Sequence, residues 1–296
     1  MRDPMTRLLG VAVAAASLFA ADAQACALSP NIVTPAAPST TYNVFDPAPT
    51  VRDVSVTLTN TAPTQCLVRL AAQSFNSASP QFGMAGASAL LAYELLAPGG
   101  VPIESSSSPL DGLAITVPAN GSAAVTLRIR IASGQVVSPG VYQDSMQLRT
   151  FDASSLALLQ SQAVTAIASV APQAQVAVVG TGPGDTVDFG DLLEGKTLGI
   201  QVYLRGNTNM SVTFISANRS TLRHESLVSA RPIPYTAAFG GSTLNLSGGS
   251  AEVVRSLASI NAAGGQFPMV FTIGSTAGSA AGRYTDTMML VVLPNP

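Results

Sequence analysis

One motif occurs twice in this chain, and it constrains the possible fold more than any other feature. Residues 140–148, GVYQDSMQL, return 142 positions later as residues 282–290, GRYTDTMML. Three further residues recur at the same spacing, and the pairs are Tyr93 with Tyr235, Ser74 with Ser216, and Asn76 with Asn218. Matches at separate places with one spacing indicate an internal repeat. The sequence therefore predicts two diverged copies of one domain.

Apolar side chains recur at every second position in both copies. Residues 125–131 (VTLRIRI) show this alternation in the first copy, and residues 267–273 (FPMVFTI) show it in the second. This period is typical of strands with one buried face, and Gly-rich turn sequences separate the segments. We therefore expect an all-β protein with two immunoglobulin-like antiparallel β-sandwich domains, residues 26–171 and 172–296.

The tyrosine and the aspartate of the repeated motif predict a sheet corner. In immunoglobulin-like sandwiches a tyrosine near the start of strand F donates a hydrogen bond back to the backbone, and Tyr142 and Tyr284 fit this position. Asp144 and Asp286 share a face with these tyrosines, so they should point inward and need backbone or hydroxyl partners. The alternative is a catalytic role, but no general base accompanies either aspartate. We interpret both as structural.

The two copies end differently. After its motif the first copy continues into residues 158–170, where the alternation predicts a closing strand, whereas the second copy ends on its motif strand. A sandwich that lacks its last (G) strand exposes a groove and an unpaired edge, which another chain can fill. The inward-facing residues of the final strand are the expected groove and chaperone-contact site: Tyr284, Asp286, Met288, Leu290 and Val292.

The first 25 residues have the pattern of a secretory signal peptide. Arg2 and Arg7 flank a short charged start, and the apolar residues 8–21 follow. Residues 23–25 (AQA) supply the small side chains that signal peptidase requires, so cleavage is expected after Ala25. The sequence therefore predicts export through the inner membrane.

Export places the two cysteines, Cys26 and Cys66, in an oxidising space. A disulfide between them closes a loop of about 40 residues and would stabilise the fold by about 4 kcal/mol on the chain-entropy account. The alternative is lipidation of Cys26, for which Ala23 and Gln24 are unfavourable neighbours. We predict the disulfide.

The low content of charged residues limits the kinds of molecule that the protein can bind. Charged residues make up 10% of the chain, the net charge is -2, and Lys196 is the single lysine. These values exclude a basic surface for nucleic acid. Residues 190–197 (GDLLEGKT) match the letters of a phosphate-binding loop, but two acidic residues lie inside it and a strand is expected from Leu198. Because such a loop needs a following helix, no nucleotide site is predicted.

The chemistry-bearing residues predict neither a metal site nor an enzyme. Asp185, Asp188, Asp191 and Glu194 are three positions apart, unlike the alternate ligands of the common calcium loop. His224 is the only histidine, and a zinc site needs several nitrogen or sulfur ligands. We expect no cofactor.

Several short motifs of the second copy resemble the spore coat protein U domain family. They are residues 187–190 (VDFG), 216–218 (SAN), 233–235 (IPY) before a Gly-rich hairpin, and 282–286 (GRYTD). The resemblance covers most of residues 172–296 and, more loosely, residues 26–171. The family includes subunits of the archaic class of chaperone-usher pili.

The resemblance implies a mode of assembly. In that family a pilin fold lacks its G strand, a periplasmic chaperone fills the groove temporarily, and the amino-terminal strand of the next subunit replaces the chaperone. Here residues 31–49 are rich in proline, which disfavours a donor strand. The resemblance therefore implies a tip adhesin that accepts a strand and gives none. Its expected partners are the chaperone, an outer-membrane usher and a neighbouring pilin subunit, on a route through the periplasm to a pilus at the cell surface.

The first copy is the expected adhesive part. Apolar loops at its free end would bind hydrophobic or abiotic surfaces, and the candidates are Phe82, Met84, Leu90 and Leu91. The alternative is that these side chains cover an end of the core. For the whole chain, the alternatives are a free exported binding module, a structural protein of a spore or cell coat, and a secreted hydrolase.

Overall fold

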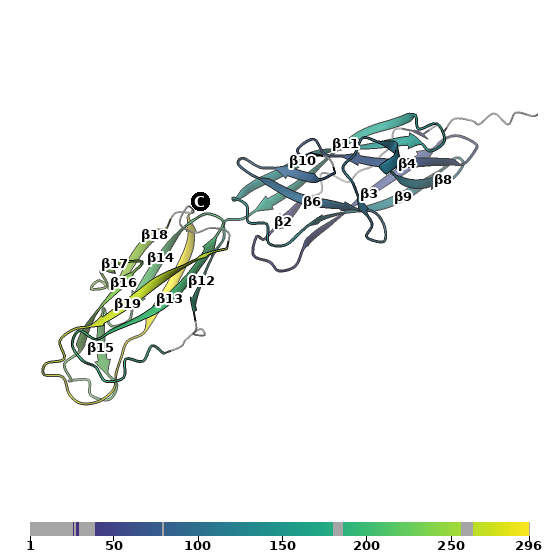
Figure 1. Ribbon diagram of the computed structural model, residues 1–296. Coiled ribbons are helices and arrows are strands. Elements are labelled where there is room, and N and C mark those ends of the chain that lie inside the picture. The colour runs from purple at the N-terminus through teal and green to yellow at the C-terminus, as the bar shows by residue number, and fades with distance from the viewer. Residues whose placement is uncertain are drawn as a thin grey trace, which may run out of the picture.

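The strands of the protein form two β-sandwiches, as the repeat predicts. In Figure 1 two elongated bodies follow one another end to end, and each encloses its own apolar core. Strands β1 to β11 are named the first domain here, and strands β12 to β21 the second domain. The computed structural model describes residues 26, 28–29, 39–78, 80–179, 186–255 and 263–295. The expected signal peptide, residues 1–25, lies outside this part of the chain.

The strands of the first domain form one 11-stranded sheet that folds into two layers around the core. One layer pairs β1, β3, β9 and β6 in that order, and the other pairs β8, β4, β10, β11 and β2. Strand β5 joins the layers, because it pairs with both β6 and β10. All of these pairs are antiparallel except β11 with β2. The strands are β1 (Leu28–Ser29), β2 (Ser39–Tyr42), β3 (Thr50–Asn60), β4 (Cys66–Gln73), β5 (Phe82–Ala85), β6 (Leu90–Leu96), β7 (Pro102–Ile103), β8 (Leu113–Val117), β9 (Gly121–Ile131), β10 (Gly140–Asp152) and β11 (Leu158–Val170).

The second domain repeats this plan with fewer strands. Its first sheet runs in the order β12-β13-β19-β16-β15-β20, and its second sheet has the order β18-β14-β21. The strands are β12 (Ala174–Val179), β13 (Thr197–Gly206), β14 (Asn209–Ser216), β15 (Thr221–His224), β16 (Ile233–Phe239), β17 (Ser242–Leu244), β18 (Ser250–Arg255), β19 (Gly265–Ile273), β20 (Tyr284–Thr285) and β21 (Met288–Asn295). The predicted all-β class is confirmed.

Alternation of apolar and polar residues explains why these segments are strands. Leu127, Ile129 and Ile131 of β9 are buried, whereas Arg128 and Arg130 between them are exposed to solvent. Successive side chains of a strand point to opposite faces of the sheet, so such a sequence buries one face only. The single helical turn within the described residues is a short 3₁₀ segment, Pro109–Asp111, and no described helix has the length and apolarity needed to cross a membrane.

The sequence repeat extends to the pairing register. In the first domain Leu148 of β10 lies opposite Ala72 of β4. In the second domain Leu290 of β21 lies opposite Phe214 of β14, which is the same pair moved by 142 positions. The pairing of β6 with β9 and of β16 with β19 agrees in the same way. Each domain is therefore a template for the other.

A short link, residues 171–173, joins the two domains and is held by a buried asparagine. The side chain of Asn207, in the turn after β13, donates to the carbonyl of Ala171 (3.0 Å) and accepts from the N–H of Gln173 (2.7 Å). The hydroxyl of the next residue, Thr208, donates to the carbonyl of Asn295 at the end of β21 (3.2 Å). One turn thus anchors both the link and the end of the last strand, and Figure 1 shows the C-terminus at the end of the second domain that faces the first domain.

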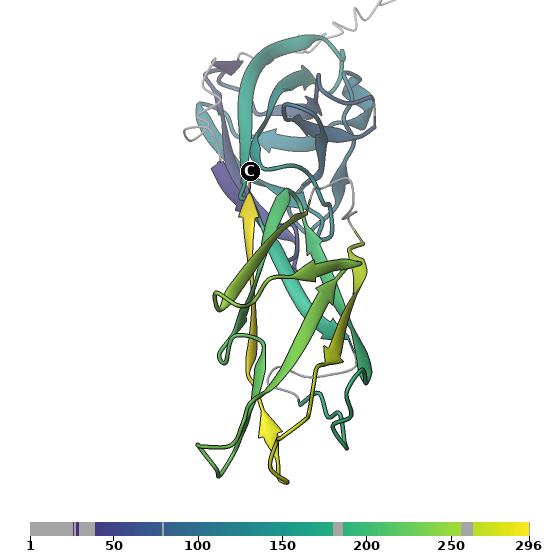
Figure 2. The same cartoon turned by 90° about the vertical axis from the view of Figure 1, so that its left-hand side faces the viewer.

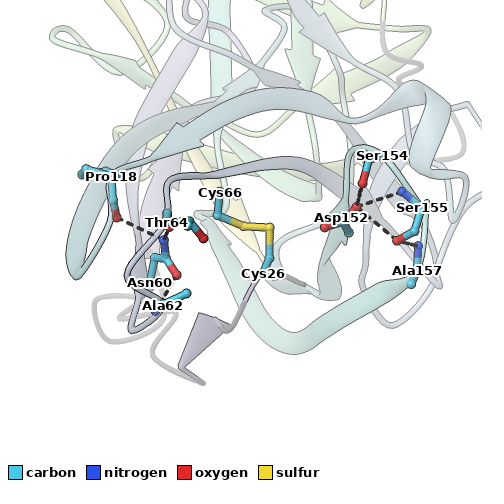
Figure 3. Close-up of a disulfide and its surroundings, with 10 residues drawn as sticks. All are labelled: Cys26, Asn60, Ala62, Thr64, Cys66, Pro118, Asp152, Ser154, Ser155 and Ala157. Carbon is cyan, nitrogen blue, oxygen red and sulfur yellow. Dashed lines mark hydrogen bonds between the residues drawn. A yellow bond between two sulfur atoms is a disulfide. The ribbon is translucent and has the colours of Figure 1, made fainter. Parts of the chain in front are cut away.

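The predicted disulfide between Cys26 and Cys66 is present, with the Cα atoms 5.4 Å apart (Figure 3). It lies at the end of the first domain that faces away from the second domain. The buried side chain of Asn60 holds the neighbouring loops there, because it donates to the carbonyls of Thr64 (2.8 Å) and Pro118 (3.2 Å). The disulfide therefore ties the start of the described chain to a well-bonded sheet end.

Candidate functional site

The most distinctive feature of the second domain is the edge formed by β21. In the first domain the equivalent strand, β10, pairs with β4 on one side and along its length with β11 on the other. Strand β21 pairs with β14, and among the described residues no strand pairs with its other side. Backbone N–H and C=O groups on that side are therefore available to a further strand.

The core-facing side chains of β21 are less buried than those of β10. Met146 and Leu148 of β10 are both fully buried, at 0% exposure. Their counterparts Met288 and Leu290 are only half-buried against the core of the second domain, and so is Val292. The outward face of β21 is apolar too, and Met289 is 52% exposed. The strand thus presents apolar side chains on both faces.

Strand β12 forms the opposite side of this open edge. It is the last strand of its sheet and lies next to β21, but no backbone ladder joins the two strands. Its inward-facing Ala174 and Val176 are half-buried and contact the same core as Met288, Leu290 and Val292. These five residues are apolar and partly buried between the edge strands of the two sheets, and the strip that they form is called the edge groove. Figure 2 shows β21 running along the length of the domain at this edge.

Asp286, two residues before the start of β21, is the centre of a hydrogen-bond network. One carboxylate oxygen, Oδ2, accepts from the hydroxyls of Tyr235 (2.6 Å) and Ser216 (2.6 Å). The other, Oδ1, accepts from the backbone N–H groups of Asn218 (2.9 Å) and Thr287 (2.8 Å). The carboxylate thus has four partners within its own domain. The expectation that this aspartate finds hydroxyl and backbone partners is confirmed.

An equivalent network exists in the first domain, where Asp144 at its centre is fully buried. Asp144 accepts from the hydroxyl of Tyr93 (2.7 Å) and from the side-chain amide of Asn76 (3.0 Å). Burial raises the pKa of Asp144, and hydrogen bonds from Tyr93, Ser74 and the Phe75 backbone partly offset this effect. The residues that recur at one spacing therefore converge in space on one carboxylate in each domain.

The predicted tyrosine corner is also present in both domains. The hydroxyl of Tyr142 donates to the carbonyl of Ser138 (2.8 Å), and that of Tyr284 donates to the carbonyl of Ala280 (3.1 Å). The glycines that begin the two motifs, Gly140 and Gly282, have φ angles of 146° and 148°. Only glycine adopts such angles readily, which explains why both copies of the motif begin with it.

The five predicted groove residues therefore fall into two groups. Met288, Leu290 and Val292 belong to the edge groove, whereas Tyr284 and Asp286 form the tyrosine corner and the hydrogen-bond network that precede β21. The alternation of Ala174 and Val176 with more exposed residues marks the other wall of the groove. That signal is visible in the sequence, but only the sheet order shows which strand it faces.

Three of the four predicted adhesion residues are not at the surface. Phe82 and Met84 lie in β5, and Leu91 lies in β6, and all three are buried in the core of the first domain with exposures of 2%, 1% and 0%. The prediction that they form an exposed apolar loop is wrong, because the two strands pair with each other and turn these side chains inward. Leu90 is 43% exposed.

The segment that matches the letters of a phosphate-binding loop, residues 190–197, is not followed by a helix. Residues 190–196 form turns and β13 begins at Thr197, so the geometry of a phosphate-binding loop is absent at this place. The described residues hold no group of three or more His, Cys, Asp or Glu side chains that could bind a metal ion. Asp185 lies outside the described residues.

No known protein-family model matches this sequence, and no curated protein matches it either. Among solved structures, it is similar to a chain of the CsuC-CsuE chaperone-tip adhesion subunit pre-assembly complex from the archaic chaperone-usher Csu pili of Acinetobacter baumannii. The TM-score is 0.50 at 16% identity, over 90% of this chain and 99% of that chain. This likeness shows the fold. The CupB6 tip adhesin of Pseudomonas aeruginosa is more distant, with a TM-score of 0.38 at 11% identity over 82% of this chain and 86% of that chain.

Proposed function

We propose that this protein is a structural and adhesive subunit of a chaperone-usher pilus and that its second domain accepts a β-strand from another chain in the edge groove. The observation that carries this proposal is the unpaired side of β21 together with the half-exposed Met288, Leu290 and Val292 beneath it. In the first domain the same positions are closed by β11. A partner's strand would supply what β11 supplies there.

The chemistry of the groove fits a strand better than a small molecule. A strand that adds to a sheet edge gains backbone hydrogen bonds along its length and places every second side chain in the groove. Because β21 is apolar on both faces, it is an aggregation hazard while its edge is open. A chaperone that covers this edge during passage through the periplasm would remove that hazard, and the next pilin subunit would take over at the usher.

The complete first domain is the expected adhesive part of a tip subunit. It has its own closing strand, so it needs no partner to complete its fold. The end that faces away from the second domain carries the disulfide and the loops bonded by Asn60. A tip position places this end foremost, where it would meet a hydrophobic or abiotic surface.

Co-expression tests strand acceptance directly. We expect genes for a chaperone and an usher beside the gene for this protein, and we expect the full exported chain to form a soluble one-to-one complex with that chaperone. In the complex the backbone amides of β21 should exchange with solvent far more slowly than in the chain alone. A chain that is soluble, monomeric and fully protected at β21 without any partner would contradict the proposal.

Two leucines of β21 provide a matched pair for this experiment. Leu290 faces the groove, whereas Leu293 is 59% exposed on the outward face. Leu290→Asp buries a charge once the groove is filled, so it should abolish the complex. Leu293→Asp should leave the complex intact. Equal loss in both variants would show that the groove is not the binding site.

A further inference from the structure

The first domain shows what a strand in the edge groove must look like. Strands β4 and β10 pair in the same register as β14 and β21, so the position of β11 against β10 can be transferred to β21. In the first domain Ala168 of β11 lies opposite Tyr142, and Ala166 lies opposite Asp144. An incoming strand in this register would place one residue opposite Tyr284 and another opposite Asp286.

Both alanines of β11 fill space that admits little more than a methyl group. Ala166 and Ala168 are each 0% exposed, and Val164 and Val170 on either side are 3% exposed. The ring of Tyr142 is packed closely against Gly86, where an added Cβ atom would lie 2.4 Å from it, so the ring cannot shift towards that residue. Closely packed protein interiors accept larger side chains only by displacing the neighbouring side chains. The small residues of β11 are thus matched to the tyrosine corner and the aspartate network.

The second domain offers the same two groups to its partner. The hydroxyl of Tyr284 is bonded to Ala280, and the carboxylate of Asp286 has four partners within the domain. Neither group needs a polar atom from the incoming strand. A polar or charged residue opposite Asp286 would instead lose its hydration without gaining a partner.

We infer that the strand accepted by the second domain carries small apolar residues, alanine or glycine, at the two positions opposite Tyr284 and Asp286, with a larger aliphatic residue opposite Met288. The template is the Val-Ala-Ala series formed by Val164, Ala166 and Ala168. This inference rests on the proposed function and adds a rule of side-chain size to it. The rule selects among partner strands, because a strand with large residues at all inward positions would clash at the corner.

The chain itself supplies the probe for a test. Asp152 at the end of β10 corresponds to Pro294, so a copy of residues 153–170 attached after Pro294 should fold back on β21 as β11 folds back on β10. In the full exported chain this copy should raise the melting temperature of the second domain and slow the exchange of the β21 amides. Replacing the copy of Ala166 or of Ala168 by Leu should remove at least roughly 5 °C of that gain.

The matched control adds a leucine side chain to the outward face of the copied strand. Ser169 of β11 is exposed, so Leu at the copy of Ser169 should keep the full gain in melting temperature. If every copy, including the Ala→Leu versions, gives the same gain, the size rule is wrong while strand acceptance stands. If the unchanged copy neither raises the melting temperature nor protects β21, strand acceptance in the edge groove is itself wrong.

Discussion

The two domains share one strand framework and differ in how it is closed. In the first domain β10 lies between β4 and β11, and its core-facing Met146 and Leu148 are fully buried. In the second domain β21 has β14 on one side only, and Met288 and Leu290 at the same positions are half-buried. A single strand therefore decides whether the same motif is fully buried or lies at a partly exposed edge.

The hydrogen-bond network around the aspartate, unlike the strand framework, is complete in both domains. Asp286 keeps its bonds to Tyr235 and Ser216 although no described strand covers it, as Asp144 keeps its bond to Tyr93 under β11. The corner at the start of the strand is thus formed independently of closure. On the proposed function, a partner strand would meet a corner that is already formed, and less ordering would be needed on binding.

The largest expected difference between the domains concerns the disulfide, which ties the first domain alone. Replacing both Cys26 and Cys66 by Ser should destabilise the first domain by about 4 kcal/mol on the chain-entropy account. Calorimetry of the full chain should show a lower first-domain transition and an unchanged second-domain transition. A shift of both transitions together would mean that the two domains unfold as one unit.

Leu148 and Leu290 occupy the same position in the two domains, so replacing each of them measures how much the closing strand β11 contributes to stability. Leu148→Ala should cost about 3 kcal/mol of unfolding free energy, because Leu148 is fully buried. Leu290→Ala should cost about 1 kcal/mol in the open second domain, since part of its side chain is already in contact with solvent.

The leucine comparison becomes sharper when the groove is filled. In the complex with a partner strand, the cost of Leu290→Ala should rise towards that of Leu148→Ala, as measured by denaturant unfolding. Leu293→Ala on the outward face is the control and should cost little in either state. A cost at Leu290 that does not change with strand binding would show that the bound strand leaves this position open.

Much of this architecture is predictable from the sequence because it depends on local patterns and on the repeat. The alternation predicts the strands, the motif beginning at Gly140 predicts the corner, and the two cysteines predict their pairing. The convergence of Ser216, Tyr235 and Asp286 is not predictable in this way. The repeat marks these residues, but only the pairing of strands distant in sequence brings them together.

The wrong prediction has a related cause. Phe82 and Met84 flank a glycine in a short segment between turns, which is typical of a loop. They are buried because β5 pairs with β6. In this pairing Phe82 lies opposite Tyr93, and the centroids of these two rings are 5.3 Å apart, so the rings pack against each other. Short strands owe their burial to such partners rather than to their own pattern.

Removing the tyrosine hydroxyl that donates to the aspartate in each domain should have a smaller effect on the free energy of unfolding. Tyr93→Phe should cost about 2 kcal/mol, because a fully buried carboxylate loses a donor. Tyr235→Phe should cost about half as much, since Asp286 is less buried and keeps Ser216 and two backbone donors. Unfolding of each variant in urea would measure both costs. Equal costs would mean that the open edge does not expose the carboxylate to solvent.

The smallest expected effect is on pH dependence, and it belongs to the first domain. Hydrogen bonds from the Ser154 hydroxyl and the Ser155 N–H lower the pKa of Asp152 to about 2 (Figure 3). A carboxyl whose pKa is lowered by folding stabilises the native state above its ordinary pKa, 3.8, and loses this contribution as the pH falls towards 2. Pro294 stands at the matching position of the second domain, which therefore has no equivalent term.

Asp152→Asn should separate this contribution from that of the buried Asp144. Burial raises the pKa of Asp144, so its contribution has the opposite sign: it is present below pH 3.8 and is lost as the pH rises above that value. Between pH 4 and pH 2 the first domain of the unchanged chain should therefore lose more stability than that of Asp152→Asn, in which the Asp144 contribution remains. The second domain should respond alike in both proteins, since neither carboxyl belongs to it. An equal loss on acidification in both first domains would show that the turn bonds of Asp152 do not persist in solution.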